Sequence, residues 1–149
     1  MKLVVDASVA VKWFFRDRTD ESQVDEALNV LSGVATGAIE LIQPPHFVAE
    51  VSAVLAREAP EHAQRDLRDL QDILFSIRDD AAVYARAMKL AIQLDHHLFD
   101  TLYHAVALET PGAVLVTADR RYLAKAKAKA DDRVCSLTGS RALISGERP

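Results

Sequence analysis

The chain has 149 residues, half of them hydrophobic, which is enough for one domain with a buried core. The sequence contains no run of about 18 apolar residues that could span a membrane. The apolar run at its start is too short for a signal peptide, so we expect a cytoplasmic protein. A single cysteine excludes an internal disulfide, and the formal charge of -4 is unusual for a protein that must neutralise phosphates.

The first expected strand covers residues 2–5 and ends at Asp6. Its short apolar run is typical of a buried parallel strand rather than a half-exposed one. A helical pattern follows over residues 7–15. Asp6 and Ser8 can each accept backbone N–H bonds at the start of that helix.

The next segment contains an acidic residue close to an apolar helix face. Glu50 follows Phe47 by three residues, so it points near the apolar stripe instead of opposite it. Pro44 and Pro45 end the strand before this helix, because proline lacks a backbone donor. The expected elements here are helix 20–36 with Val24, Leu28 and Leu31 on one face, strand 40–42 and helix 46–58.

In the second half, two more acids stand near helix starts. Asp100 lies in the first turn of a helix, where the dipole favours a negative charge, and Asp119 follows an apolar strand. We expect the polar residues 138–149 to be at least partly disordered, or ordered only by a partner. The expected elements are helix 60–76 with Leu67, Leu70, Ile73 and Leu74 inward, a vestigial strand at 77–78, helix 80–94, a helix ending at Glu109, strand 113–116, helix 121–129 and strand 133–137.

This alternation of strands and helices predicts an α/β fold. It favours one domain over residues 1–137, with a parallel central sheet of four to five short strands flanked by helices. Ligands bind such sheets beyond the carboxyl ends of the strands, which is where Asp6 and Asp119 stand.

Four short motifs carry the acidic residues: V-V-D-A-S-V, F-V-A-E-V, L-F-D-T-L-Y-H-A-V-A and L-V-T-A-D-R-R-Y. In this order they resemble the PIN-domain ribonucleases, and most closely the VapC-type toxins of bacterial toxin–antitoxin pairs. The resemblance implies a metal-dependent endoribonuclease that cuts single-stranded RNA, with tRNA or rRNA as plausible substrates. It also implies a homodimer and a cognate antitoxin that inserts a segment near the acidic pocket, with an Arg that pairs with its carboxylates.

On this resemblance Asp6, Glu50, Asp100 and Asp119 form the catalytic, metal-binding site. Asp6 and Asp100 are expected to bind the metal directly, and Glu50 and Asp119 directly or through water. Clustered carboxylates repel unless a cation sits between them, and oxygen-only ligation suits Mg²⁺ or Mn²⁺. Removing these four from the 22 acidic residues leaves 18 acidic against 18 basic residues, so the net charge does not exclude RNA.

Every predicted site residue except Glu50 also has an ordinary explanation. Helix capping alone accounts equally well for Asp6, Asp100 or Asp119 taken singly, and for the supporting residues Ser8 and Thr117, which match small hydroxyl positions of the family. Glu50 has no such explanation.

Basic residues follow two of the acids and are candidate phosphate contacts: Lys12, Arg16, Arg120 and Arg121. A solvated helix face is the alternative for each of them. His97 and Phe99 replace a small residue and a tyrosine of many relatives. Metal ligation by the pair His96 and His97 is not expected, because adjacent residues face different ways.

Three other functions compete with the nuclease. A receiver-like domain would need an additional acid pair near the first strand and a lysine late in the chain at a strand end, whereas only Asp6 is present. A haloacid-dehalogenase-like phosphatase would need an aspartate at the position of Ser8. The stronger alternative is a PIN-like scaffold that binds RNA or an antitoxin without cutting.

Overall fold

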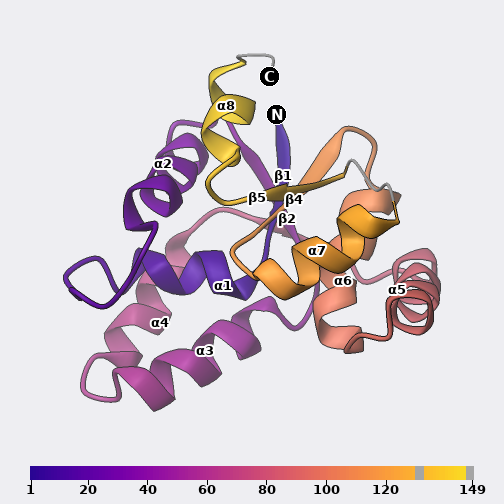
Figure 1. Ribbon diagram of the computed structural model, residues 1–149. Coiled ribbons are helices and arrows are strands. Elements are labelled where there is room, and N and C mark those ends of the chain that lie inside the picture. The colour runs from indigo at the N-terminus through magenta and orange to yellow at the C-terminus, as the bar shows by residue number, and fades with distance from the viewer. Residues whose placement is uncertain (130–132, 147–149) are drawn as a thin grey trace.

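The computed structural model describes residues 1–129 and 133–146 (Figure 1). One parallel sheet of five strands, in the order β3-β2-β1-β4-β5, forms the centre of the molecule. This confirms the α/β fold with a parallel sheet flanked by helices. The strands are β1 Lys2–Val5, β2 Glu40–Gln43, β3 Ser76–Ile77, β4 Ala113–Thr117 and β5 Val134–Ser136.

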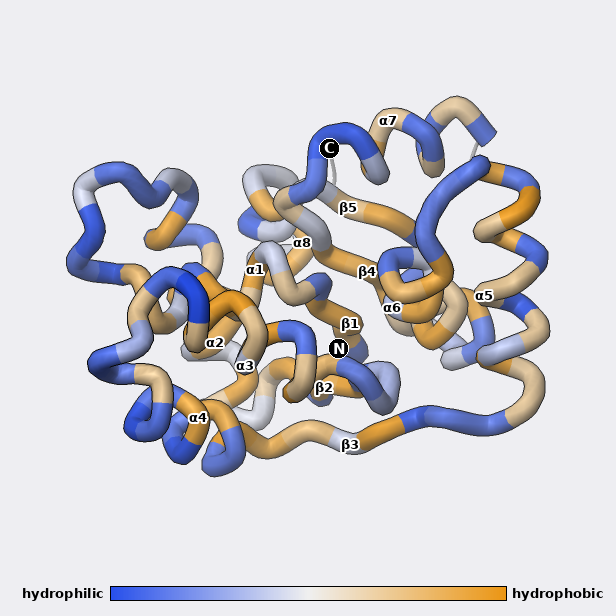
Figure 2. The backbone as a smooth tube through the Cα atoms, turned by 90° about the horizontal axis from the view of Figure 1, so that it is seen from below, coloured by the Kyte–Doolittle hydropathy of each residue, from blue (hydrophilic) through white to orange (hydrophobic). Residues whose placement is uncertain are grey.

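Helices connect the strands and cover the sheet. They are α1 Ala7–Ala10, continued by the 3-10 turn η1 Val11–Trp13, α2 Val24–Ala35, α3 Phe47–Glu58, α4 Ala63–Asp72, α5 Ala81–Leu94, α6 Leu98–Glu109, α7 Arg120–Ala128 and α8 Ser140–Ser145. Figure 1 shows α2, α3 and α4 on one side of the central strands and α5, α6 and α7 on the other. In Figure 2 the central strands are hydrophobic, as expected for strands buried on both faces. None of the described helices is long and apolar enough to cross a membrane.

The two central strands bring their carboxyl ends together. β1 and β4 pair from Lys2 opposite Ala113 to Val5 opposite Val116, and the backbone N–H of Asp6 donates to Val116 at 3.0 Å. The residues that follow these strands, Asp6 and Asp119, therefore leave the sheet at the same edge.

A buried glutamine completes the pairing of β1 with β2. Backbone pairing covers only the first residues, Lys2 opposite Glu40 and Leu3 opposite Leu41. Further along, the Gln43 side chain donates to the Val5 carbonyl at 2.8 Å and accepts from the Val5 N–H at 2.9 Å. This side chain takes the place of strand pairing directly before Asp6.

Two helices are shorter than predicted. α2 begins at Val24 because Gln23 adopts a left-handed conformation with φ of 59°, so residues 20–23 form a loop. The most buried positions of α2 are Ala27, Val30 and Val34, while the predicted face is only partly buried. α4 ends at Asp72 because Ile73 is extended, which leaves Leu74 85% exposed instead of inward.

The C-terminal segment takes part in the fold. Residues 140–145 form α8, which packs beside α2, and Leu143 and Ile144 are partly buried against the core. Residues 140–145 of the predicted tail are thus a helix in the structure. The last three residues of the predicted tail, 147–149, lie outside the described residues.

Candidate metal centre

Asp6 lies at the junction of β1 and α1, where hydroxyl groups hold one of its carboxylate oxygens. Its Oδ2 accepts hydrogen bonds from Ser8 Oγ and, at 3.2 Å, from Thr117 Oγ1. Ser8 Oγ in turn accepts from the Ala118 N–H at 3.1 Å. Ser8 and Thr117 thus tie the ends of β1 and β4 to Asp6.

Helix capping does not account for Asp6 or Asp100. The side chain of Asp6 makes no capping bond to α1, and the cap position of α6 is held by His97, not by Asp100. Asp119 does cap α7, since its Oδ1 accepts from the Tyr122 N–H at 3.0 Å. The ordinary explanation therefore holds for Asp119 alone, which keeps a second carboxylate oxygen.

The structure brings the four predicted acids together in two overlapping groups. Carboxylate oxygens of Asp6, Glu50 and Asp100 all lie within 4.8 Å of one another. Asp119 lies within the same distance of Asp100 and of a nitrogen of His96. Asp100 belongs to both groups and connects them.

The pKa of Asp6 reflects its burial and the neighbouring carboxylates. The pKa of Asp6 is raised from 3.8 to about 6. Burial is the largest cause of this rise, and the charges of Glu50 and Asp100 also contribute to it. The hydrogen bonds from Ser8 and Thr117 act in the opposite direction. Burial and the same three carboxylates also raise the pKa of Tyr103 far above its usual value, so this residue is a neutral phenol beside the cluster. A cation bound between the acids would relieve the repulsion.

Two histidines next to the acids have side-chain contacts that sequence reasoning missed. His96 Nε2 lies 2.7 Å from Asp100 Oδ2, and His46 Nε2 lies 3.2 Å from Glu50 Oε2 without hydrogen-bond geometry. In both pairs the histidine stands four residues before the acid and just before the helix that carries it. That shared spacing is the sequence signal that could have found them. His97 is exposed while the His96 side chain is 7% exposed, so the two adjacent rings do differ in environment.

The predicted basic residues differ in their availability. Arg16, Arg120 and Arg121 are exposed and free to contact phosphate. Lys12 is not, because its Nζ binds Glu21 Oε1 at 2.6 Å and the Ser22 carbonyl at 2.8 Å, in a side chain that is 8% exposed. The assignment of Lys12 as a phosphate contact is therefore corrected: its charge is already paired inside the fold.

Two surface grooves share His97 in their lining, and Asp100 lines the first of them. An apolar groove of about 440 Å³ is lined by His46, Ala49, Glu50, His97, Phe99 and Asp100. A polar groove of about 290 Å³ is lined by Ala91, Asp95, His96, His97, Arg121 and Lys125. Glu50 and Asp100 thus line a groove suited to an apolar group, and Arg121 and Lys125 line the neighbouring polar groove.

The raised pKa of Asp6 predicts how stability depends on pH. A carboxyl whose folded pKa is raised contributes stability that is complete below 3.8 and is lost as the pH rises through about 6. That difference corresponds to at most about 3 kcal/mol. In EDTA, Asp6→Asn should therefore raise the free energy of unfolding at pH 8 and do so much less at pH 4, measured by urea denaturation.

Asp80→Asn is a control of opposite sign. Arg78 lowers the pKa of Asp80, so the charged form stabilises the fold above pH 3.8 and its loss should destabilise the protein at pH 8. An Asp6→Asn variant that is less stable than the wild type at pH 8 in EDTA would show that the ionised Asp6 carboxylate does not destabilise the fold.

Comparison with known proteins places the chain in a family. Residues 3–129, which include all four acids, match the PIN domain. The crystal structure of PAE2754 from Pyrobaculum aerophilum is similar in fold, with a TM-score of 0.63 over 98% of this chain and 99% of that chain, at 21% sequence identity. No curated protein matches the chain. The chain belongs to the PIN domain family, whose members are generally nucleases that use divalent metal.

Proposed function

We propose that this protein is a Mg²⁺- or Mn²⁺-dependent endoribonuclease. The observation that carries the proposal is the convergence of Asp6, Glu50 and Asp100, with ligand atoms within 4.8 Å, at the carboxyl edge of the sheet. Among the described residues no lysine or arginine pairs with these three carboxylates, which makes the arrangement costly for stability alone. The arrangement is a suitable one for a hard divalent cation.

The donor set fits such a cation. Asp6, Glu50 and Asp100 supply only oxygen, and Asp119 adds a carboxylate oxygen within 4.8 Å of Asp100. When bound, a divalent cation makes a coordinated water more acidic and stabilises negative charge on phosphate oxygens. Ser8 and Thr117 hold the carboxylate of Asp6 in one orientation.

The surroundings of the acids suit single-stranded RNA. Arg120 and Arg121 at the start of α7, together with Arg16, offer exposed positive charge for phosphates. Phe99 is 62% exposed beside Asp100, in the apolar groove, where an unstacked base can lie against its ring. A base in a duplex could not reach this groove without leaving its stack.

The substrate class is tested with end-labelled oligonucleotides of one sequence: single-stranded RNA, its RNA duplex and single-stranded DNA. With Mn²⁺, we expect internal cuts in the single-stranded RNA and little cleavage of the duplex. Addition of excess EDTA should stop the reaction, and excess Mn²⁺ should restore it. Equal cleavage of DNA would contradict the RNA assignment, and binding without any cleavage would favour the non-cutting scaffold.

We further propose that the nuclease is the VapC-type toxin of a cytoplasmic toxin–antitoxin pair and a homodimer. On α5, the side chains of Tyr84, Met88 and Ile92 recur every four residues and are 40%, 58% and 81% exposed. Such an apolar stripe supports burial against a second copy of the chain. An antitoxin that carries an arginine could pair with the acids and block them.

The dimer is tested by sedimentation of the wild type and of Ile92→Glu. We expect a dimeric wild type and a folded, monomeric variant, because the new charge cannot be buried without a partner. A monomeric wild type at high concentration would remove the homodimer.

A further inference from the structure

His96 precedes α6 by two residues and lies against the acidic cluster, yet no function has so far been assigned to it. We propose that His96 is a positioning residue: its Nε2–H donates to one oxygen of Asp100 and directs the other oxygen toward the metal. Lys125 sets the tautomer of the imidazole that makes this possible. The inference rests on the proposed metal-dependent nuclease and adds two residues to its site.

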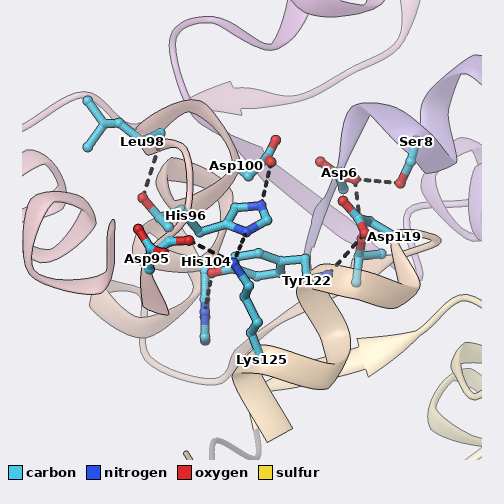
Figure 3. A network of polar contacts seen from close by, with 12 residues as sticks. Asp6, Ser8, Asp95, His96, Leu98, Asp100, His104, Asp119, Tyr122 and Lys125 are labelled. Carbon is cyan, nitrogen blue, oxygen red and sulfur yellow. Dashed lines mark hydrogen bonds and ion pairs between the residues drawn. The ribbon is translucent and has the colours of Figure 1, made fainter. Parts of the chain in front are cut away.

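The contact between His96 and Asp100 is short and sheltered. Nε2 lies 2.7 Å from Oδ2, and the imidazole is 7% exposed while the carboxylate is 32% exposed. Figure 3 shows the ring between Asp100 on one side and Lys125 on the other. A buried imidazole thus contacts one oxygen of a partly exposed carboxylate.

Lys125 decides which nitrogen of His96 carries the proton. Its Nζ lies 3.2 Å from His96 Nδ1 and 2.6 Å from the Asp95 carbonyl. An ammonium group only donates hydrogen bonds, so Nδ1 must accept and the proton must be on Nε2. Nε2 then donates to Asp100.

This tautomer excludes His96 as a metal ligand, although its nitrogen lies within 4.8 Å of oxygens of Asp100 and Asp119. Ligation through Nε2 needs that nitrogen without a proton, with Nδ1–H donating to an acceptor. Lys125 occupies that place with a donor. The arrangement therefore suits orientation of a ligand instead of ligation.

Tyr122 holds the imidazole in place and connects it to the fourth acid. The rings of His96 and Tyr122 meet edge to face with centroids 4.9 Å apart, and Tyr122 is 2% exposed. The backbone N–H of Tyr122 donates to Asp119 Oδ1 at 3.0 Å. Tyr122 thus packs against the His96 ring that orients Asp100 and donates a hydrogen bond to the carboxylate of Asp119.

The three aspartates share one pattern. In each, the side-chain and backbone hydrogen bonds from the described part of the chain go to one oxygen: Oδ2 of Asp6 from Ser8 and Thr117, Oδ2 of Asp100 from His96, and Oδ1 of Asp119 from Tyr122. The other oxygen of each carboxylate is left for a cation. Loss of a partner that orients a metal ligand typically weakens metal binding by about 10- to 100-fold.

The first test measures Mn²⁺ affinity by calorimetry without RNA, for the wild type and folded variants. His96→Ala should weaken binding by about 10- to 100-fold. His96→Gln should stay within a few-fold of the wild type, because its amide N–H can replace the Nε2–H donor. His62→Ala, an exposed histidine directly before α4, should leave the affinity unchanged. Equal losses for His96→Gln and His96→Ala would overturn the positioning role.

The second test reads the tautomer by long-range ¹H–¹⁵N NMR of the wild type. We expect a proton on Nε2 both in EDTA and at saturating Mg²⁺, and mixed tautomers in Lys125→Met. A proton on Nδ1 in the wild type, or loss of the Nε2 proton when Mg²⁺ binds, would overturn the proposal. This spectrum can be recorded even if His96→Ala does not fold.

The outcomes distinguish a failure of the proposed nuclease function from a failure of the role of His96. If the wild type binds no Mn²⁺, the proposed nuclease function fails, and with it the purpose of His96. If the wild type binds Mn²⁺ and cuts RNA but carries the Nδ1–H tautomer, only the role of His96 and Lys125 fails.

Discussion

Replacing Asp6 or Asp100 by asparagine is expected to lower RNA cleavage by at least about 100-fold, the scale of loss when a group that stabilises transition-state charge is removed. Each substitution removes one negative charge from a cluster whose ligand atoms lie within 4.8 Å, while the amide keeps nearly the same shape. Asp6→Asn retains an oxygen that can accept from Ser8 and Thr117, and Asp100→Asn one that can accept from His96. The fold should therefore survive.

The measurement is the initial rate of cleavage of labelled single-stranded RNA in Mn²⁺, together with Mn²⁺ affinity. Asp25→Asn is a matched control, because Asp25 also lies in the first turn of a helix but is exposed and outside the cluster. Its rate should equal that of the wild type. A folded Asp6→Asn protein with unchanged activity would remove the acidic cluster from the mechanism.

Gln43→Met is expected to lower the free energy of unfolding by about 2–4 kcal/mol. The methionine fills a similar volume but leaves the N–H and the carbonyl of Val5 without their partners, and each unsatisfied buried group costs about 1–3 kcal/mol. Gln43 is fully buried, so water cannot replace these bonds. Urea denaturation checks the change in stability.

The control for this substitution is Glu40→Met. Glu40 lies at the exposed start of the same strand, and its change should stay within about 0.5 kcal/mol. Because Val5 directly precedes Asp6, Gln43→Met should also weaken Mn²⁺ binding. A Gln43→Met protein as stable as the wild type would show that the stability of the end of β1 does not depend on this side chain.

The sheet and the positions of the acids were predictable because short stretches of sequence indicate them. Short apolar runs mark β1 and β4, and each run ends shortly before an acid, so a parallel arrangement places Asp6 and Asp119 at one edge. Glu50 was predictable from its place near an apolar helix face. The family order of the motifs then added Asp100.

The parts that sequence reasoning missed depend on contacts between distant segments. Lys125 acts on His96 from 29 residues away, and no local pattern in the sequence indicates that pair. Lys12 looked like a phosphate contact because only the fold brings Glu21 to its ammonium. The polar composition of residues 138–149 concealed a helix that is held by packing beside α2.

The most direct test of the central claim is cleavage of purified tRNA and total RNA by antitoxin-free protein with Mg²⁺ or Mn²⁺. Reactions with EDTA and with Asp100→Asn run beside it. We predict discrete fragments that are absent from both controls. No cleavage of any RNA by folded, metal-loaded protein would contradict the nuclease and leave a PIN-domain scaffold that binds without cutting.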